Sequence, residues 1–99
     1  MATHITSGTT VGGAVSTVTF ANWYHNVSVY NRSSGDMWVR FDGVDPTIAG
    51  DECFFVAALS ALDTVNPKLP PEPAIGQTSN TVVKILTAAN ATYTVQAGV

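Results

Sequence analysis

The sequence predicts an all-β protein, a small antiparallel β-sandwich or barrel-like domain of six to eight short strands. Short stretches in which apolar and polar residues alternate recur along the chain, and turn-forming residues separate them. Threonine and valine each occur 13 times, and their β-branched side chains suit pleated sheets. No long helical periodicity interrupts this pattern, so strands account for the whole predicted domain.

The first predicted segment, residues 1–16, is a flexible N-terminal arm. It is rich in Thr, Ser and Gly and has no long apolar periodicity, so it cannot bury enough surface to offset the entropy cost of ordering. A frayed terminus and an arm that orders on a neighbouring subunit both fit this composition. Residues 17–99 then form a single β-domain.

The first strands of that domain are predicted from alternation at Thr17–Phe20 and Val27–Asn31. Ser33–Asp36 is a predicted turn, because Gly tolerates positive φ and Ser and Asp side chains bond to nearby backbone. Met37–Asp42 alternates most regularly, which places Met37, Val39 and Phe41 on one face. Together the two stretches around the turn predict a β-hairpin.

The second half begins with the apolar run Cys53–Leu59, which predicts a strand buried on both faces; a helix over Phe55–Leu62 is the alternative. Four prolines within residues 67–73 exclude regular structure, so residues 66–76 form a predicted proline-rich loop of the kind that often binds partners. Thr81–Leu86 and Tyr93–Val95 complete the predicted strands.

The charge content excludes several kinds of partner. Only 11% of the residues are charged, and four Lys and Arg residues against seven acidic ones leave a net charge of −3. No basic patch is available for nucleic acid, and no apolar run is long enough to span a membrane. A small domain with so few charges is marginally stable and poorly soluble alone, so we expect a homo-oligomer whose uncharged surfaces are covered by partners.

Catalysis, cofactors and metals are not predicted. A nucleophile needs a nearby base, and neither His4 nor His25 belongs to a recognisable nucleophile motif. The single cysteine, Cys53, lies at the start of an apolar run, where a buried inert thiol is expected. Five acidic residues lie between Asp36 and Glu52, but their spacing differs from a calcium-binding loop, so we interpret them as solvated turn residues.

Four aromatic residues, Trp23, Tyr24, Tyr30 and Trp38, raise the possibility of carbohydrate binding, because aromatic faces stack on sugars. Core packing and subunit contacts explain the same residues equally well. Trp38 lies on the polar face of its strand, where an exposed ring would mark a contact surface.

Residues 30–51, YNRSSGDMWVRFDGVDPTIAGD, resemble small virion structural proteins encoded among the head and tail genes of tailed bacteriophages. The shared pattern is a strand ending near Asn-Arg, a Gly-containing turn, an aromatic strand ending in Asp-Gly, and a Pro-Thr-x-x-Gly-Asp loop. A buried strand and a final strand pair follow, so the resemblance covers about residues 27–95. The proline-rich insert at residues 66–73 departs from the pattern.

The resemblance implies a capsid decoration (cement) protein of the virion, made in the cytoplasm of the bacterial host. Such a protein binds the major capsid protein at the capsid surface and stabilises the head, and the threefold sites of capsid lattices would suit a trimer. A tail-associated or fibre-adaptor subunit is the alternative within the virion, and a carbohydrate-binding module is the alternative outside it. The predicted contact residues are Thr9, Thr10, Val11, Trp23, Tyr24, Trp38, Pro70 and Pro71.

Overall fold

The computed structural model describes residues 3–21, 24, 26–41, 44–48, 50, 53–65 and 80–98, with the side chains of residues 3, 4 and 63–65 left aside. This part of the chain contains strands and no helix. The strands are β1 (Thr3–Thr10), β2 (Ser16–Phe20), β3 (Asn26–Asn31), β4 (Met37–Arg40), β5 (Phe54–Val56), β6 (Ala61–Val65), β7 (Thr81–Thr87) and β8 (Ala91–Gly98).

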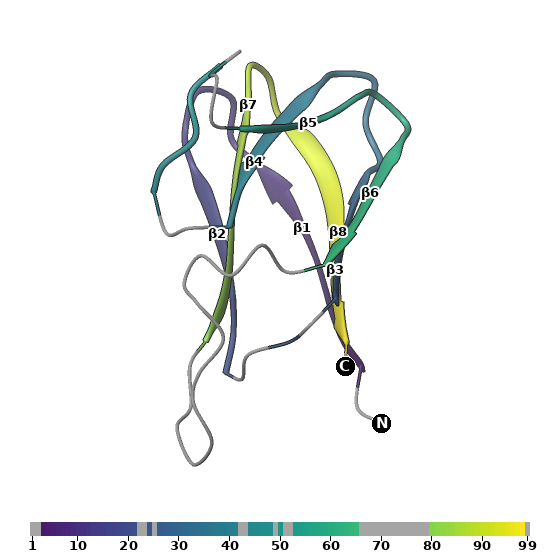
Figure 1. Ribbon diagram of the computed structural model, residues 1–99. Coiled ribbons are helices and arrows are strands. Elements are labelled where there is room, and N and C mark those ends of the chain that lie inside the picture. Colours follow the sequence, from purple (N-terminus) through teal and green to yellow (C-terminus); the bar gives the residue numbers. More distant parts are fainter. Residues whose placement is uncertain are drawn as a thin grey trace.

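The strands form two four-stranded antiparallel sheets that pack face to face (Figure 1). One sheet has the order β1-β8-β3-β6 and the other has the order β2-β7-β4-β5. The predicted antiparallel β-sandwich is therefore confirmed. The predicted β-hairpin of Val27–Asn31 with Met37–Asp42 is wrong, because β3 and β4 belong to different sheets and the turn between them crosses from one sheet to the other.

The pairing of the strands is nested. β1 pairs with β8, β2 with β7, β3 with β6 and β4 with β5, as in one long hairpin. The hairpin is rolled up so that β8 also pairs with β3 and β7 with β4. This is the jelly-roll topology of eight-stranded double-sheet proteins.

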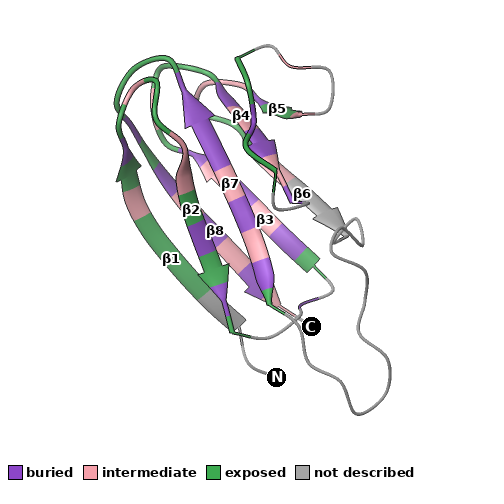
Figure 2. Ribbon diagram, turned by 90° about the vertical axis from the view of Figure 1, so that its left-hand side faces the viewer, coloured by how far each residue is buried: buried purple, intermediate pink, exposed green. Residues whose placement is uncertain are grey.

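The core lies between the sheets and follows from the strand period of two. The predicted inward face of Met37, Val39 and Phe41 is confirmed, because none of these side chains is more than 3% exposed. Val29 on the facing sheet is fully buried, and so is Ile85, which lies opposite Val39 in the same sheet. Alternate residues of β3, β7 and β8 therefore point outward, which determines the composition of the outer surfaces (Figure 2).

β1 differs from the prediction of a flexible arm over residues 1–16. Its eight residues pair in unbroken register with β8, from Thr3 opposite Gly98 to Thr10 opposite Ala91. Backbone hydrogen bonds hold this strand, and they require no apolar side chain, so its composition did not reveal it. Gly8 fits the same strand because a Cβ there would lie 2.6 Å from Oη of Tyr93.

The Cys53–Leu59 segment also differs from its prediction. Only Phe54–Val56 forms a strand, β5, and it lies at the edge of its sheet, where Phe54 is 38% and Phe55 55% exposed. No helix forms over Phe55–Leu62; Ala57–Ser60 is a turn instead. Cys53 is half-buried rather than buried, with its Sγ 3.7 Å from the Thr47 carbonyl oxygen. The proline-rich loop lies outside the described residues.

Candidate interaction surface

A largely uncharged surface of the described chain is the outer face of β1, β8 and β3, which we call the hydroxyl face. On β3 and β8 the residues that alternate with the buried ones point outward, and on β1 the residues at odd positions lie on the face opposite to that of the buried Thr10. Most carry hydroxyl or amide groups, and none of these strand residues carries a formal charge, although the exposed Arg32 follows directly after β3. The hydroxyl face consists of Ile5, Ser7 and Thr9 from β1, Thr92, Thr94 and Gln96 from β8, and Asn26, Ser28 and Tyr30 from β3.

Rows of side chains cross the hydroxyl face from strand to strand. Ser7 lies opposite Thr94, and Thr94 lies opposite Tyr30 on the other side. The hydroxyl oxygens of Ser7 and Thr94 are 2.8 Å apart, which is a hydrogen bond. This cross-strand pair holds two of the hydroxyls of the face in position.

Two shallow depressions open on this face, and Arg32 lies between them because it lines both. One has a volume of about 620 Å³ and is lined by Tyr30, Asn31, Arg32, Leu59, Ser60, Ala61 and Thr94. The other has a volume of about 460 Å³ and is lined by Ser7, Gly8, Thr9, Arg32, Thr92 and Tyr93. The hydroxyl face is therefore not flat around Arg32, where the two depressions lie.

The first depression is shaped by two turns that Asn31 holds together. This side chain is 2% exposed, and its Nδ2 donates hydrogen bonds to the carbonyl oxygens of Gly35 at 2.7 Å and Val56 at 3.1 Å. Its Oδ1 accepts a hydrogen bond from the Ser33 backbone N–H at 3.0 Å. The turn after β3 and the turn after β5 are therefore fastened to one buried amide.

Leu59 stands at the rim of this depression in an unusual conformation. Its φ of 55° lies in the left-handed region, which costs a non-glycine residue about 1–2 kcal/mol. Its N–H nevertheless donates a hydrogen bond to the Ser33 carbonyl at 3.0 Å, which fixes the turn. The result is a leucine side chain that is 76% exposed beside Tyr30 and Arg32. Strain of this kind often accompanies a functional position.

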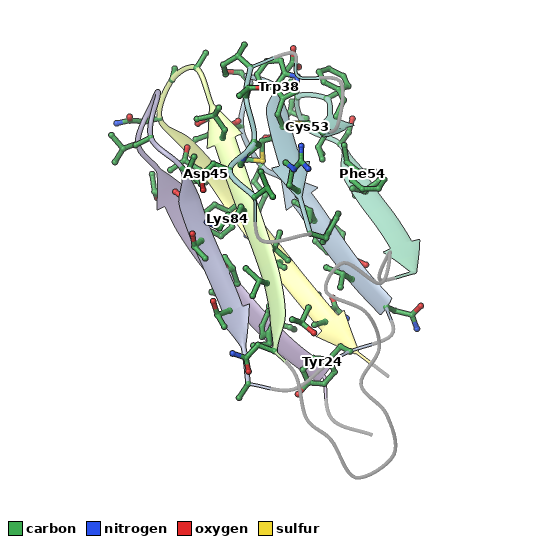
Figure 3. All side chains as sticks on the ribbon, turned by 60° about the vertical axis from the view of Figure 1, so that its left-hand side comes forward. Tyr24, Trp38, Asp45, Cys53, Phe54 and Lys84 are labelled. Carbon is green, nitrogen blue, oxygen red and sulfur yellow. The ribbon has the colours of Figure 1, made fainter. Side chains whose placement is uncertain are left out.

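The opposite outer face, formed by β2, β7, β4 and β5, has a different character. Lys84 on β7 forms an ion pair with Asp45 at 2.8 Å (Figure 3). Trp38 on β4 is half-buried and packs edge-on against Phe55, with ring centroids 5.9 Å apart. This face therefore combines charges with a small aromatic group and does not share the uniform polarity of the hydroxyl face.

The predicted contact residues are distributed over different parts of the structure. Thr9 is exposed on the hydroxyl face, and Val11, 63% exposed, follows it in the turn after β1. Trp38 lies on the other sheet, apart from them. Trp23, Pro70 and Pro71 lie outside the described residues.

Two predicted contact residues prove to be core residues. Thr10 is fully buried, and its hydroxyl forms a hydrogen bond with the hydroxyl of Thr87. Tyr24 is 4% exposed, and its ring packs edge-on against Phe20 at 6.1 Å. Neither side chain is available to a partner in this structure, because both fill the space between the sheets.

The sequence patterns did not single out Arg32 and Leu59, two of the exposed residues that border the depression beside Tyr30. Nothing in the local pattern distinguishes Leu59 from its apolar neighbours, since its exposure follows from the left-handed turn. The alternation of polar residues in Thr92–Gln96 was a usable signal for an outward polar row.

The described residues contain no candidate metal-binding site. No three His, Cys, Asp or Glu side chains among them come together in the way a metal ion requires. The described residues also include no helix that is long and apolar enough to cross a membrane.

Comparison of this chain with known proteins found no match. This holds for protein-family models, for curated proteins and for solved structures.

Proposed function

We propose that this protein is a virion structural protein, a homo-oligomeric capsid decoration protein that binds the major capsid protein and stabilises the head. The observation that carries the proposal is the hydroxyl face, whose strand residues carry no formal charge. Its donors and acceptors suit contact with another folded protein, because burying hydroxyls and amides that find partners costs far less than burying charges.

Three further arguments support the proposal that the protein is a component of the capsid shell. The jelly-roll topology is an architecture of viral capsid domains, which is an analogy at the level of the fold. Many copies on a symmetric shell would also turn weak contacts into firm attachment through effective concentration. The scarcity of Lys and Arg fits a role on the protein shell rather than on the packaged nucleic acid.

The proposal is tested with purified capsids that lack decoration, mixed with the protein and analysed by co-sedimentation and electron microscopy. We expect regular bound density at lattice sites. Gln96→Glu places one charge in the hydroxyl face without changing the shape of the side chain, and it should weaken binding at least about tenfold.

The matched control is Asn90→Asp, which adds the same charge in the exposed turn before β8. Its carboxylate can still accept the hydrogen bond that Oδ1 of Asn90 accepts from Gly12 N–H. Equal loss of binding in both variants, or no bound density with the wild-type protein, would count against decoration through this face. If deletion of the gene gives tailless or non-adsorbing particles with intact heads, the tail alternative replaces it.

Carbohydrate binding is the second candidate, and the depression beside Tyr30 is the observation that favours it. An aromatic ring bordered by Arg32, Ser60 and Thr94 offers a stacking surface together with hydrogen-bonding groups. A glycan array tests this function directly. Binding that is lost in Tyr30→Ala and kept in Trp38→Ala would assign it to the depression, whereas an array without hits would exclude it.

A further inference from the structure

We infer that two copies of this chain associate through the free edge of β1, with the two β1 strands antiparallel around a twofold axis. The two β1-β8-β3-β6 sheets would then become one continuous eight-stranded sheet. The inference rests on the self-association included in the proposed function and assigns a surface to it.

The edge of β1 has the hydrogen-bonding groups that such pairing needs. β1 is the end strand of its sheet and pairs only with β8, over its whole length of eight residues. Within the described residues, no backbone hydrogen bond joins its other edge to a neighbouring strand. That edge therefore presents alternate N–H and C=O groups to the surroundings, and another extended strand is the partner that satisfies them.

β1 also lacks the features that normally prevent edge pairing. Proteins protect their edge strands with charged side chains, prolines, bulges or very short strands. β1 contains no Lys, Arg, Asp, Glu or Pro, and its register with β8 is unbroken. By contrast, β5 is only three residues long and β6 contains Asp63. The remaining edge strand, β2, is also uncharged, but it has five residues where β1 has eight, so β1 offers the longest unprotected edge of the described strands.

A second β1 fits this edge better than a strand of unknown composition. Antiparallel pairing of two identical strands places no like charges opposite each other, and it brings Ser and Thr side chains together, which is favourable. If the twofold axis passes beside one residue of β1, that residue lies opposite its own copy. Every odd-numbered residue of one β1 then lies opposite an odd-numbered residue of the other β1. The outward side chains Ile5, Ser7 and Thr9 then stay on one side, and the hydroxyl face extends across both copies. Ile5, which is 62% exposed, gains a neighbour across the axis.

The first test measures self-association of the full chain by sedimentation equilibrium from about 1 μM to about 1 mM, a range suited to weak contacts. We expect a monomer–dimer equilibrium. Ile5→Lys adds one positive charge to the edge strand of each copy, which is a feature that normally prevents edge pairing, and should raise the dissociation constant at least about tenfold. Ile48→Lys makes the same exchange in the exposed loop before β5 and should change the constant less than about twofold.

The second test uses amide hydrogen exchange at low and high protein concentration. Amides of residues 3–10 should become more protected at high concentration, while those of β2 should not change. A wild-type protein that remains monomeric overturns the inference. So does association that Ile5→Lys leaves unchanged, protection confined to another surface, or a closed trimer, which needs head-to-tail contacts.

Capsid binding separates this inference from the proposed function. Wild-type dimers formed through β1 that do not bind capsids would refute decoration and leave the dimer contact intact. Capsid binding by a protein that never dimerises would refute the dimer contact and leave decoration of the capsid intact.

Discussion

Thr10 and Thr87 connect the two sheets through their hydroxyl groups, whose oxygens lie 2.6 Å apart inside the core. Thr10 belongs to β1 and Thr87 to β7, and neither side chain is more than 2% exposed. The Thr10 hydroxyl also accepts a hydrogen bond from Ala91 N–H at 3.0 Å. A polar group that is costly to bury is thereby satisfied, and the end of β1 is fastened to both sheets.

Replacement of Thr10 by valine should destabilise the protein by about 1–3 kcal/mol, because the shape is kept while Ala91 N–H loses its acceptor. Urea unfolding followed by circular dichroism measures the change. Thr9→Val is the control, since Thr9 is exposed, and its effect should stay within about 0.5 kcal/mol. Equal stability of the two variants would show that the buried hydroxyl does not stabilise this corner.

Asn31→Asp should destabilise the protein by at least about 2 kcal/mol, because it replaces a donating amide by a carboxylate beside carbonyl oxygens. Asn90→Asp is the matched control, because the Asn90 side chain is exposed and serves Gly12 N–H as an acceptor. Thermal unfolding of the two variants compares them. If both lose the same stability, Asn31 does not have the role of fastening the turns.

Leu59→Asn should raise the stability by about 0.5–1 kcal/mol, because asparagine adopts the left-handed conformation more easily than leucine. Leu59→Val should lower it by about 1 kcal/mol or more, because β-branched residues tolerate positive φ poorly. Chemical denaturation measures the free energy of unfolding of each variant and shows whether it rises or falls. Because the side chain is 76% exposed, lost packing contributes little to either variant. A stabilising valine would contradict the left-handed turn.

Gly8→Ala should destabilise the protein by about 1–3 kcal/mol, because the new methyl group would lie 2.6 Å from Oη and 2.9 Å from Cζ of Tyr93. The Tyr93 ring is 8% exposed and has little room to move aside. Gly35→Ala is the control, since a Cβ at Gly35 meets no atom within 4 Å, and it should be neutral or slightly stabilising. Calorimetry of both variants gives the comparison. A neutral Gly8→Ala would mean that the ring can shift at little cost.

The fold was predictable to the extent that local alternation reveals strands. Met37–Phe41 shows its inward face in the sequence, and Thr81–Leu86 and Tyr93–Val95 lie within β7 and β8. The order of the strands was not predictable, because pairs such as Thr3 opposite Gly98 join residues from the two ends of the chain. β1 was missed because backbone pairing, rather than apolar periodicity, holds an edge strand in place.

The candidate site was less predictable than the fold. Thr9 and Val11 were expected to be exposed and are, but Thr10 between them is buried, since neighbouring residues of a strand point to opposite faces. The hydroxyl face combines strands that are far apart in the sequence, so no single segment reveals it. Leu59 owes its exposure to a turn whose shape depends on Asn31, a contact that a sequence pattern does not encode.

The nested pairing of the strands also constrains how the protein is made on the ribosome. β7 and β8 are inner strands, and they supply the partners of β2 and β1. A nascent chain that ends before residue 81 contains only the pairs β3 with β6 and β4 with β5. Neither sheet can close during most of translation, so ribosome-bound chains of that length should leave β1 and β2 sensitive to protease. Folding is thus expected to finish only after residues 81–98 have emerged.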